Sequence, residues 1–547
     1  MRMGIMYLSQ RKLIAALLFI IAAMLTVCGM ITYRVSVSND TTAYYSYNRL
    51  KSNRSDGEAL DHINEDFVTD KGFVSHLSLV IIDTGGTEPP INTKFIIDPS
   101  FADGGVHMPI EGVEPYVDGN ITVIDDIDGD GVNSPYDSPV YSGKISIKRR
   151  GNTSMSYEKA QWLMKLKNDA GEEAYANLLD MGDGNEWILN GSLADKSMLR
   201  NYLAYSTASQ ILDFTPDSRF CEVLIKDGNK LNYQGVYLLM ENIRRGVNRV
   251  DITDYKSSET YNSYILKRDR FDPKGVMLEN YGRLNGYSEE YISIVYPSAK
   301  KLTPEMEEYI NADINKIEEI LYSDDPKVFA TYKEVLNVDS FIDYFLINEY
   351  FGNYDAGNNS TYFYKERGGK LAMGPVWDFD GAMDNYRFEP FDVESIAFYT
   401  KPWYERLCLD RDFLEKLKHR YLVLKRSYLN NDVIIDRIDE ILMYLGDATD
   451  REWYRWGDVY KGENALSLED YELNDGTVLH RNAESIDDEI FRIKTMLREH
   501  SKYIYRDINM IEEDAVFNTG RDEVVGWLLL LATALFIIPA ILAVYRQ

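Results

Sequence analysis

The sequence is poor in cysteine and histidine, the residues that build most thiol, zinc and hydrolase sites. It has three cysteines and six histidines among 547 residues, and no CxxC pair. Cys28 lies in an apolar run, so the folded part can hold at most one disulfide, between Cys221 and Cys408. The histidines are scattered, which argues against a Ser-His-Asp hydrolase and against a histidine-rich metal centre.

Positive charge is also scarce. The chain has 59 Lys and Arg residues against 88 Asp and Glu residues, giving a net charge of −29. Proteins that bind nucleic acid need clusters of basic side chains to neutralise phosphates. We therefore expect no nucleic-acid partner, and a solvated acidic domain that meets divalent cations.

Two apolar runs, 13–32 and 524–544, contain no charge at all. Each has about twenty residues, the length that a helix needs to span a bilayer. Arg2, Arg11 and Lys12 precede the first run, so the positive-inside rule places 1–12 in the cytoplasm. A cleaved signal peptide is the alternative, but the run is longer than a typical signal core.

These runs predict a two-pass cell-membrane protein with an extracytoplasmic domain and both termini, 1–12 and 545–547, in the cytoplasm. The composition divides the intervening chain into three parts. These are a polar stalk at 33–70, a main domain at 71–400, and a helical C-terminal part of that domain at 401–515.

An acidic, glycine-containing loop lies within residues 120–140. Asp126, Asp128 and Asp130 alternate, Gly131 follows, and Asp137 falls at the twelfth position. Oxygen ligands at positions 1, 3 and 5, glycine at 6 and an acid at 12 are the pattern of an EF-hand-type Ca²⁺ loop. Position 12 is Asp rather than Glu and no helices flank the loop, so an acidic turn is the alternative. We favour a structural Ca²⁺ loop.

A strand, a small-residue loop and a second strand follow, over Lys144–Arg149, 150–156 and Ala160–Lys167. The backbone N–H groups of such a loop, with a lysine on the second strand, can meet a phosphate. Lys165 shares its strand face with Leu163. An ordinary surface hairpin is the alternative, because lysine is common at strand edges.

Downstream periodicities predict the remaining elements. We expect an amphipathic helix at 193–212, strands at 220–226, 235–240 and 264–267, and helices at 302–322, 339–351, 413–429, 433–445 and 486–508. Thr303 and Pro304 form an N-cap and first-turn pair for the helix at 302–322.

The segment Asn348–Asp384 places acids and amides between aromatic and apolar runs. The polar residues are Asp355, Asn358, Asn359, Asp378 and Asp380. Such groups are costly to bury unless they are paired or bind a cation. Phosphotransferases need this layout, with one carboxylate at the nucleophile and an amide and a second carboxylate on Mg²⁺. A buried polar network that fixes a turn is the alternative.

The order of these elements predicts an α+β fold, the two-lobed architecture of protein kinases with a helical C-terminal extension and two flanking transmembrane helices. Six motifs, in the same order, resemble the CotH kinase family, named for a spore coat protein. They are RRGNTSMSYEKAQWLMKL (149–166), WILNGSLADKSMLRN (187–201), NYQGVYLLMENI (232–243), SYILKRD (263–269), NEYFGNYDAGNNSTYFYK (348–365) and GPVWDFDGAMDN (374–385).

The resemblance implies roles for the acids and amides. Asp355 resembles the catalytic-loop aspartate that orients or deprotonates the acceptor hydroxyl. Asp378 resembles the metal-binding aspartate, with Asp380 beside it. Asn359 is the expected metal-binding amide, and Asn358 is its alternative.

The resemblance also implies a nucleotide site. Lys165 is the expected phosphate lysine and Lys159 its rival, with Asn152 and Ser154 in the covering loop. Glu241 is expected at the nucleotide hinge or beside a lysine. Asp195 and Arg200 are expected to face the site from the preceding helix.

The implied activity is that of an atypical kinase. It uses ATP with Mg²⁺ or Mn²⁺, and its acceptor is a hydroxyl of the protein itself or of a cell-envelope or coat protein. The chain lacks HRD and GxGxxG motifs, because Tyr354 precedes Asp355 and the loop at 150–156 has one glycine. A catalytically weak pseudokinase and a surface interaction protein that organises the envelope or coat are the alternatives.

Overall fold

The computed structural model describes residues 59–520 except 102–103, 127–128, 130, 387–389 and 462–469. The chain forms two units, Tyr44–Phe517 and the two terminal segments Met1–Ala43 and Asn518–Gln547. Only the first unit is described below. Among the described residues no helix is both long and apolar enough to cross a membrane, and the predicted spans at 13–32 and 524–544 lie outside them.

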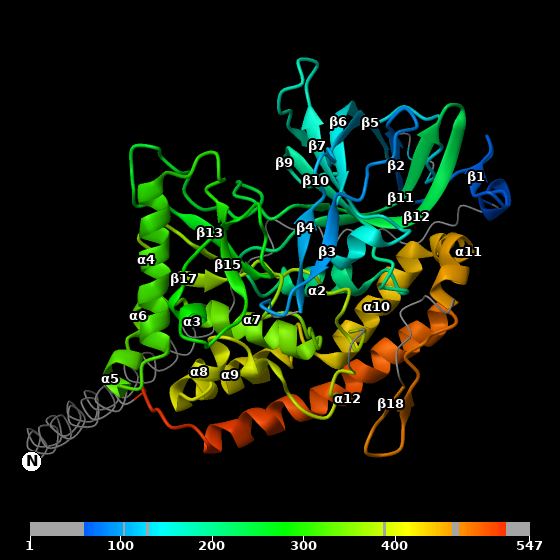
Figure 1. Ribbon diagram of the computed structural model, residues 1–547. Coiled ribbons are helices and arrows are strands. Elements are labelled where there is room, and N and C mark those ends of the chain that lie inside the picture. Colours follow the sequence, from blue (N-terminus) through cyan, green and yellow to red (C-terminus); the bar gives the residue numbers. More distant parts are fainter. Residues whose placement is uncertain are drawn as a thin grey trace, which may run out of the picture. The chain divides into compact units, whose positions relative to one another are not determined.

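The N-terminal lobe is a β-barrel (Figure 1). Its strands are β1 (Val68–Thr69), β2 (Ser78–Asp83), β5 (Val117–Ile124), β6 (Tyr141–Arg149), β7 (Trp162–Lys167), β10 (Glu186–Asn190), β11 (Ser218–Asp227) and β12 (Lys230–Glu241). The order is β1-β12-β10-β7-β6-β5-β2-β11, and β11 also pairs with β12, which closes the barrel. Only the β2–β11 pairing is parallel, with Cys221 opposite Ser78.

Alternation along the strands gives the barrel two kinds of face. Trp162, Met164 and Leu166 of β7 point into the barrel core, whereas Leu163 packs against the larger core that continues into the second lobe. The predicted face of Leu163 and Lys165 is therefore the one turned toward the second lobe.

The predicted stalk at 33–70 extends too far. The 3₁₀ helix η2 (Ala59–His62) and β1 belong to the folded unit, because β1 pairs with β12 through Val68 and Asn232. Phe67 and Leu231 pack on a small core that includes Phe73 and Tyr233. These few apolar contacts were not predictable from a segment, 59–70, that is polar overall.

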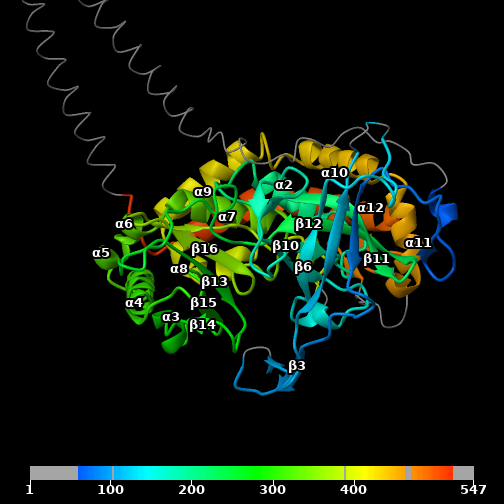
Figure 2. The same ribbon diagram turned by 90° about the horizontal axis from the view of Figure 1, so that it is seen from above.

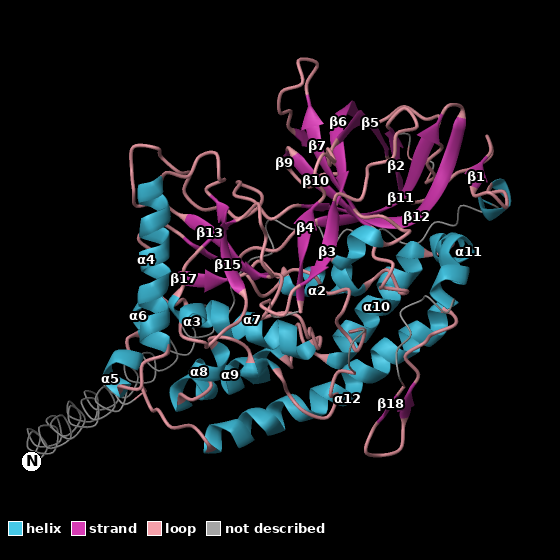
Figure 3. Cartoon of the chain, in the orientation of Figure 1, coloured by secondary structure: helices cyan, strands magenta, loops and turns pink. Residues whose placement is uncertain are grey.

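The second lobe has a five-stranded sheet in the order β14-β15-β13-β16-β17. Its strands are β13 (Tyr264–Asp269), β14 (Val276–Met277), β15 (Tyr291–Tyr296), β16 (Thr361–Lys365) and β17 (Leu371–Met373). Helices cover this sheet (Figure 3). They include α3 (Tyr281–Leu284), α4 (Pro304–Leu321), α5 (Pro326–Phe329), α6 (Tyr332–Val335), α7 (Val338–Tyr350), η4 (Phe398–Thr400) and α8 (Tyr404–Leu407).

The predicted C-terminal helices are confirmed, with small shifts at their ends. They are α9 (Arg411–Leu424), α10 (Asn431–Leu445) and α12 (Ile486–Glu513). A further helix, α11 (Ala448–Lys461), comes after α10, and a short hairpin of β18 (Tyr471–Glu472) and β19 (Val478–Leu479) follows. The predicted cap is also present, since the Thr303 side chain accepts a hydrogen bond from the Met306 N–H in α4.

One other prediction needs correction. The helix expected at 193–212 is only α2 (Arg200–Ala208), and all nine of its residues are buried, so it is not amphipathic. The sequence left a disulfide between Cys221 and Cys408 open, and in the structure both are free thiols buried in separate lobes.

A separate hairpin projects from the body of the described unit (Figure 2). It consists of β3 (Thr93–Ile97) and β4 (Gly105–Pro109), which in the described part of the chain pair only with each other. Minor elements complete the lobe: β8 (Ala176–Asn177), β9 (Asp183–Gly184) and the 3₁₀ helix η3 (Thr153–Ser156).

Candidate active site

The two predicted acids come from separate segments of the second lobe. Asp355 follows α7 in the turn before β16, and Asp378 follows β17. The intervening β16–β17 hairpin returns the chain, so the carboxylates are close enough for the Asp378 charge to raise the pKa of Asp355. The structure thus brings together Asp355, Asp378, Asp380 and Asn359, all from the segment Asn348–Asp384.

Asp355 is held beside an amide. The Asn359 side chain donates from Nδ2 to Asp355 Oδ1 at 3.2 Å, while its Oδ1 atom is buried without a hydrogen-bond partner. Burial raises the pKa of Asp355, with Arg270 opposing the shift. Asn358 turns the other way and donates to Glu290 at 2.6 Å. Of the two predicted amides, Asn359 is the one that contacts the acid and keeps an acceptor for a cation.

Asp378 lies at a strained turn. Its φ is +64°, its N–H donates to the Tyr205 hydroxyl at 3.2 Å, and its carboxylate accepts from Ser360 at 3.1 Å. Burial raises the pKa of Asp378 to about 8, and the neighbouring Asp380 adds to the rise. Ser192 of the first lobe donates to Asp380 at 2.6 Å. A divalent cation reduces the repulsion between clustered carboxylates of this kind, and oxygen atoms are the ligands that Mg²⁺ prefers.

Arg150 is a site residue that the sequence prediction missed. Its positive charge opposes the rise in the pKa of Asp378. Its guanidinium lies 5.6 Å from the centre of the Trp377 ring and donates a hydrogen bond to Gln161 at 2.7 Å. The neighbouring Arg149 points to the opposite side, where it donates to the Tyr157 carbonyl at 3.1 Å. Strand alternation separates the two arginines, and only the tertiary fold shows which one faces the acids.

Lys165 lies on the same side of β7 as Leu163, which packs against the larger core. Its ammonium is 3.0 Å from Glu186 of β10. Burial acts to lower its pKa, but Glu186 and Tyr116 outweigh burial and raise it. Lys165 is therefore a charged lysine with a carboxylate partner on the cleft face of the barrel.

Lys159 has a different setting. It is buried, and its ammonium donates to the Val236 carbonyl at 2.8 Å and to Glu452 of α11 at 2.5 Å. Burial lowers its pKa despite that partner. Lys159 joins the barrel to α11, and its role as the rival phosphate lysine stays a prediction.

Glu241 is the last residue of β12, directly before the linker to the second sheet. It accepts a hydrogen bond from the Asp217 N–H at 2.9 Å and lies 3.4 Å from Arg249, so its basic neighbour is an arginine and not the expected lysine. Burial raises its pKa to about 8.

The predicted phosphate loop borders a large cavity. Asn152 and Ser156 line it together with Asn359 and Tyr386, and its volume is about 700 Å³. Gly151 has φ +103°, and a Cβ there would lie 2.0 Å from Ser154 Oγ, so this position needs glycine. The sharp turn places Asn152 at the mouth of the cavity and Ser154 against Gly151.

Contrary to the expectation, Asp195 and Arg200 do not face the cleft. They are buried, and Arg200 Nη1 lies 2.7 Å from Asp195 and 2.6 Å from Glu489 of α12. Arg200 also donates to the Ala382 carbonyl at 2.9 Å. A buried arginine is costly without a carboxylate partner, and Glu489, the partner that holds Arg200 away from the cleft, lies too far along the chain to be predicted.

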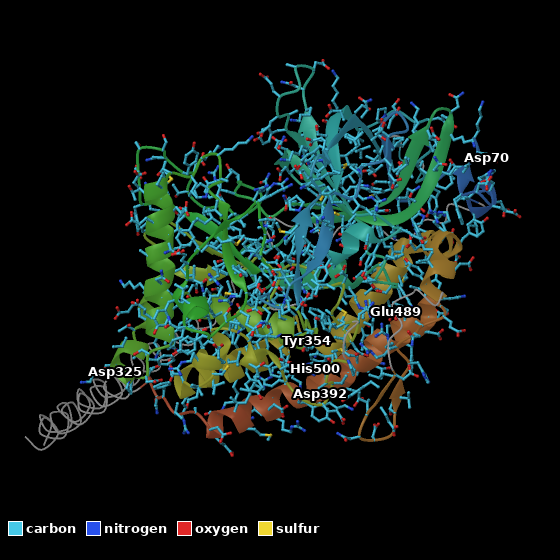
Figure 4. All side chains as sticks on the ribbon, in the orientation of Figure 1. Asp70, Asp325, Tyr354, Asp392, Glu489 and His500 are labelled. Atoms are coloured by element: carbon cyan, nitrogen blue, oxygen red, sulfur yellow. The ribbon has the colours of Figure 1, made fainter. Side chains whose placement is uncertain are left out.

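The same network holds the segment after Asp380. Arg492 bridges Glu489 at 2.8 Å and the Asp384 carbonyl at 2.5 Å, and Arg481 lies 3.0 Å from the Asp384 carboxylate. Met383 and Asp384 both have positive φ, 54° and 58°. Arg492 and Arg200 lower the pKa of Glu489 to about 2, although its burial opposes the shift. Figure 4 labels Glu489 on α12 and Tyr354 beside the catalytic loop.

The predicted calcium loop is only partly described. Asp126 accepts from the Gly131 N–H at 3.3 Å and Asp137 from the Ser134 N–H at 2.6 Å. Asp128 and Asp130 lie outside the described residues. The described residues contain no group of three or more His, Cys, Asp or Glu side chains arranged to hold a metal. The Ca²⁺ loop stays a prediction.

Comparison with known proteins shows the family of the chain. A family model described as CotH kinase protein matches residues 147–504, more than half of the chain. The chain belongs to the CotH kinase family. The match begins in β6 and ends in α12, so it covers Arg150, Asp355, Asp378 and Glu489. No curated protein matches the chain.

At the position where many kinases carry the arginine of the HRD motif, this CotH chain has a tyrosine, Tyr354. Tyr354 stacks on Tyr386 with ring centroids 4.4 Å apart, and Lys401 donates to the Tyr354 carbonyl at 2.6 Å. These contacts fix the turn that presents Asp355. A stacked aromatic pair and a lysine thus hold the turn that carries Asp355.

Proposed function

We propose that the chain is a membrane-anchored protein kinase that depends on ATP and a divalent metal. It transfers the γ-phosphate of ATP to a Ser, Thr or Tyr hydroxyl of itself or of a cell-envelope or coat protein. Family membership supports a kinase-like function. The observation that carries the finer proposal is the proximity of Asp355 and Asp378, together with Asn359, which lines the cavity and keeps a buried Oδ1 atom without a partner.

In this proposal each acid has its own role. Asp355 accepts the proton of the acceptor hydroxyl, whose oxygen forms the new bond to the γ-phosphorus as the bond to the β-phosphate oxygen breaks and ADP leaves. Arg150 and Lys165 place positive charge on the phosphates. Asp378, Asp380 and Asn359 would hold Mg²⁺ or Mn²⁺, which when bound neutralises the phosphate oxygens.

The raised pKa of Asp378 supports a cation at this position. A carboxylate whose pKa is about 8 remains largely protonated at neutral pH, and a divalent cation replaces that proton with a stronger partner. Within the described part of the chain the Asp355 side chain accepts a hydrogen bond from the amide of Asn359 alone, so one carboxylate oxygen is available to a hydroxyl. The two acids are therefore suited to different partners.

The proposal predicts that label from γ-labelled ATP enters protein only when Mg²⁺ or Mn²⁺ is present. Nucleotide and metal together should also raise the melting temperature. Protection without incorporation of label would support the pseudokinase alternative. Neither protection nor incorporation would support a surface interaction protein.

We further propose that residues 126–137 bind Ca²⁺ and that the spans at 13–32 and 524–544 anchor the chain with its large domain outside the cytoplasm. The acidic spacing and the uncharged runs support these two proposals. Chelation of Ca²⁺ should lower the melting temperature of the wild type, and Asp128→Ala should remove that sensitivity. Equal sensitivity in the variant would place the metal elsewhere.

A further inference from the structure

The hairpin of β3 and β4 exposes apolar side chains beside the candidate active site. Ile97 is 81% exposed, Phe95 50% and Ile96 40%, so most of the apolar surface of β3 meets solvent. Soluble surfaces rarely carry consecutive exposed residues of this kind without a binding role. Three such residues on one projecting hairpin indicate a surface that another molecule covers.

The hairpin forms one wall of the 700 Å³ cavity that reaches the catalytic turn. Phe95 and Phe101 lie on this wall, and Phe271 and Tyr291 of the second lobe lie opposite. Phe101 and Phe271 have ring centroids 5.5 Å apart, and Phe271 and Tyr291 5.1 Å apart. The cavity is therefore lined with aromatic rings over much of its depth.

The inner end of the cavity is continuous with the catalytic residues. Asn359 lines it, and the same side chain donates to Asp355 at 3.2 Å. Thr93, at the base of β3, donates to the Met155 sulfur at 3.4 Å, which ties the hairpin to the predicted phosphate loop. A molecule in the cavity thus lies between the hairpin and the acid that would receive the acceptor proton.

The backbone of the hairpin favours a polypeptide as the occupant. Within the described residues β3 pairs with β4 alone, so no strand covers its outer edge. An extended chain can add to such an edge through main-chain hydrogen bonds, while pockets beside it select side chains. A small molecule would leave this strand edge unused.

We propose that this cavity is the acceptor site and that it selects an extended polypeptide with a bulky apolar side chain close to its acceptor hydroxyl. The apolar side chain packs against Phe95 and Phe271, while the hydroxyl lies next to Asp355. This inference rests on the proposed kinase function and adds the class of acceptor sequence to it.

The test uses the full-length protein in detergent and synthetic peptides. Each peptide has one serine in an otherwise alanine-based sequence, and in four of them phenylalanine replaces alanine at one of the two positions on either side. Binding is measured by fluorescence anisotropy of labelled peptide, and phosphate transfer is measured in parallel. We expect at least one phenylalanine peptide to bind about tenfold more tightly than the alanine parent, or about 1.4 kcal/mol.

Phe95→Ser and Phe101→Ser change two cavity-lining residues of the hairpin, and each should remove most of that preference and leave the KM for ATP unchanged. Tyr175→Ser is the matched control, because Tyr175 is an aromatic residue that is 66% exposed and absent from the cavity lining. The control should keep the preference. Because Phe95 is 50% exposed, its replacement leaves the core intact.

The outcomes separate this inference from the proposed function. Transfer with no preference for phenylalanine, or a preference that survives both hairpin variants, would overturn the acceptor site alone. Selective binding without any transfer would overturn the kinase proposal alone. Hairpin variants that lose binding to lipid vesicles but keep the peptide preference would show that the exposed apolar strand meets a membrane, and would also overturn this inference.

Discussion

Ser360 donates a hydrogen bond to Asp378 at 3.1 Å, and its neighbour Asn359 donates to Asp355 at 3.2 Å. Two adjacent residues of one turn therefore each hold one of the two acids. Ser360 has φ +50°, which points the two neighbouring side chains to different acids. This turn fixes the relative position of the two carboxylates without any cation.

Asn359 and Asn358 are predicted to differ sharply in effect. Asn359→Ala removes the amide beside Asp355 and the buried acceptor, so the rate of phosphate transfer should fall by about 100-fold and the Mg²⁺ concentration for half-maximal rate should rise. Asn358→Ala loses only the contact with Glu290 and should change the rate by less than about threefold. Mg²⁺ titrations of both variants provide the check. A larger loss in Asn358→Ala would reassign the metal amide.

Arg150 is predicted to bind nucleotide, whereas Arg149 is structural. Arg150→Gln removes the cation beside Asp378 and should raise the KM for ATP by about tenfold. That is the loss of affinity expected when one charge-assisted hydrogen bond is removed. Arg149→Gln loses hydrogen bonds to backbone carbonyls and should lower the melting temperature with the KM for ATP unchanged. Steady-state kinetics with varied ATP decide between them. Equal KM values in Arg150→Gln and wild type would refute the assignment.

Glu489 is predicted to position the metal-binding segment from α12. Glu489→Gln leaves Arg200 and Arg492 without their shared carboxylate, which should cost about 3–5 kcal/mol of unfolding free energy. Because these arginines hold the carbonyls at 382–384, the Mg²⁺ concentration for half-maximal transfer should also rise. The measurements are urea unfolding and an Mg²⁺ titration.

Glu222→Gln is the control for this prediction. Glu222 of β11 is equally buried and pairs with Arg451 of α11 at 2.7 Å. It should lose similar stability and keep the wild-type Mg²⁺ dependence once the folded fraction is corrected. If both variants shift the Mg²⁺ dependence equally, α12 contributes to stability and does not position the metal-binding segment.

The sequence was informative where structure depends on neighbouring residues. The alternation that put Leu163 and Lys165 on one face and the Thr303 cap of α4 were predictable, because both follow from local geometry. The strand predicted at 264–267 is confirmed within β13 for the same reason. The acids of Asn348–Asp384 stood out because such groups are unusual between apolar runs.

Other features depend on residues far apart in the chain. The pairing of Cys221 with Ser78 closes the barrel, and no local pattern predicts a parallel pair over that separation. Glu489 meets Arg200 across 289 positions of sequence. Arg149 and Arg150 are identical side chains on opposite faces, and the cleft side is set by how the lobes pack. For this reason the site acids were predictable and their supporting charges were not.

Glu241 predicts a pH dependence of stability. Its folded pKa is about 8 against an ordinary value of 4.5, so between these pH values the folded protein keeps a proton that the unfolded chain releases. This group therefore stabilises the fold fully below about pH 4.5, and the contribution is lost as pH rises through 8, a change on the order of 4 kcal/mol.

Glu241→Gln removes this titration while keeping an acceptor for the Asp217 N–H. The difference in unfolding free energy between wild type and variant, measured in urea at pH 5, 6, 7 and 8, should move steadily in favour of the variant as pH rises. Parallel curves across that range would show that Glu241 titrates normally.

The most direct test of the central claim is single-turnover transfer from γ-labelled ATP by wild type, Asp355→Asn and Asp378→Asn. The account predicts Mg²⁺- or Mn²⁺-dependent incorporation of label by the wild type, and losses of at least about 1,000-fold in each variant while circular dichroism shows an intact fold. Asp378→Asn should in addition lose the protection that ATP and metal give against thermal unfolding, whereas Asp355→Asn should retain it. Incorporation that persists in both variants would contradict the account.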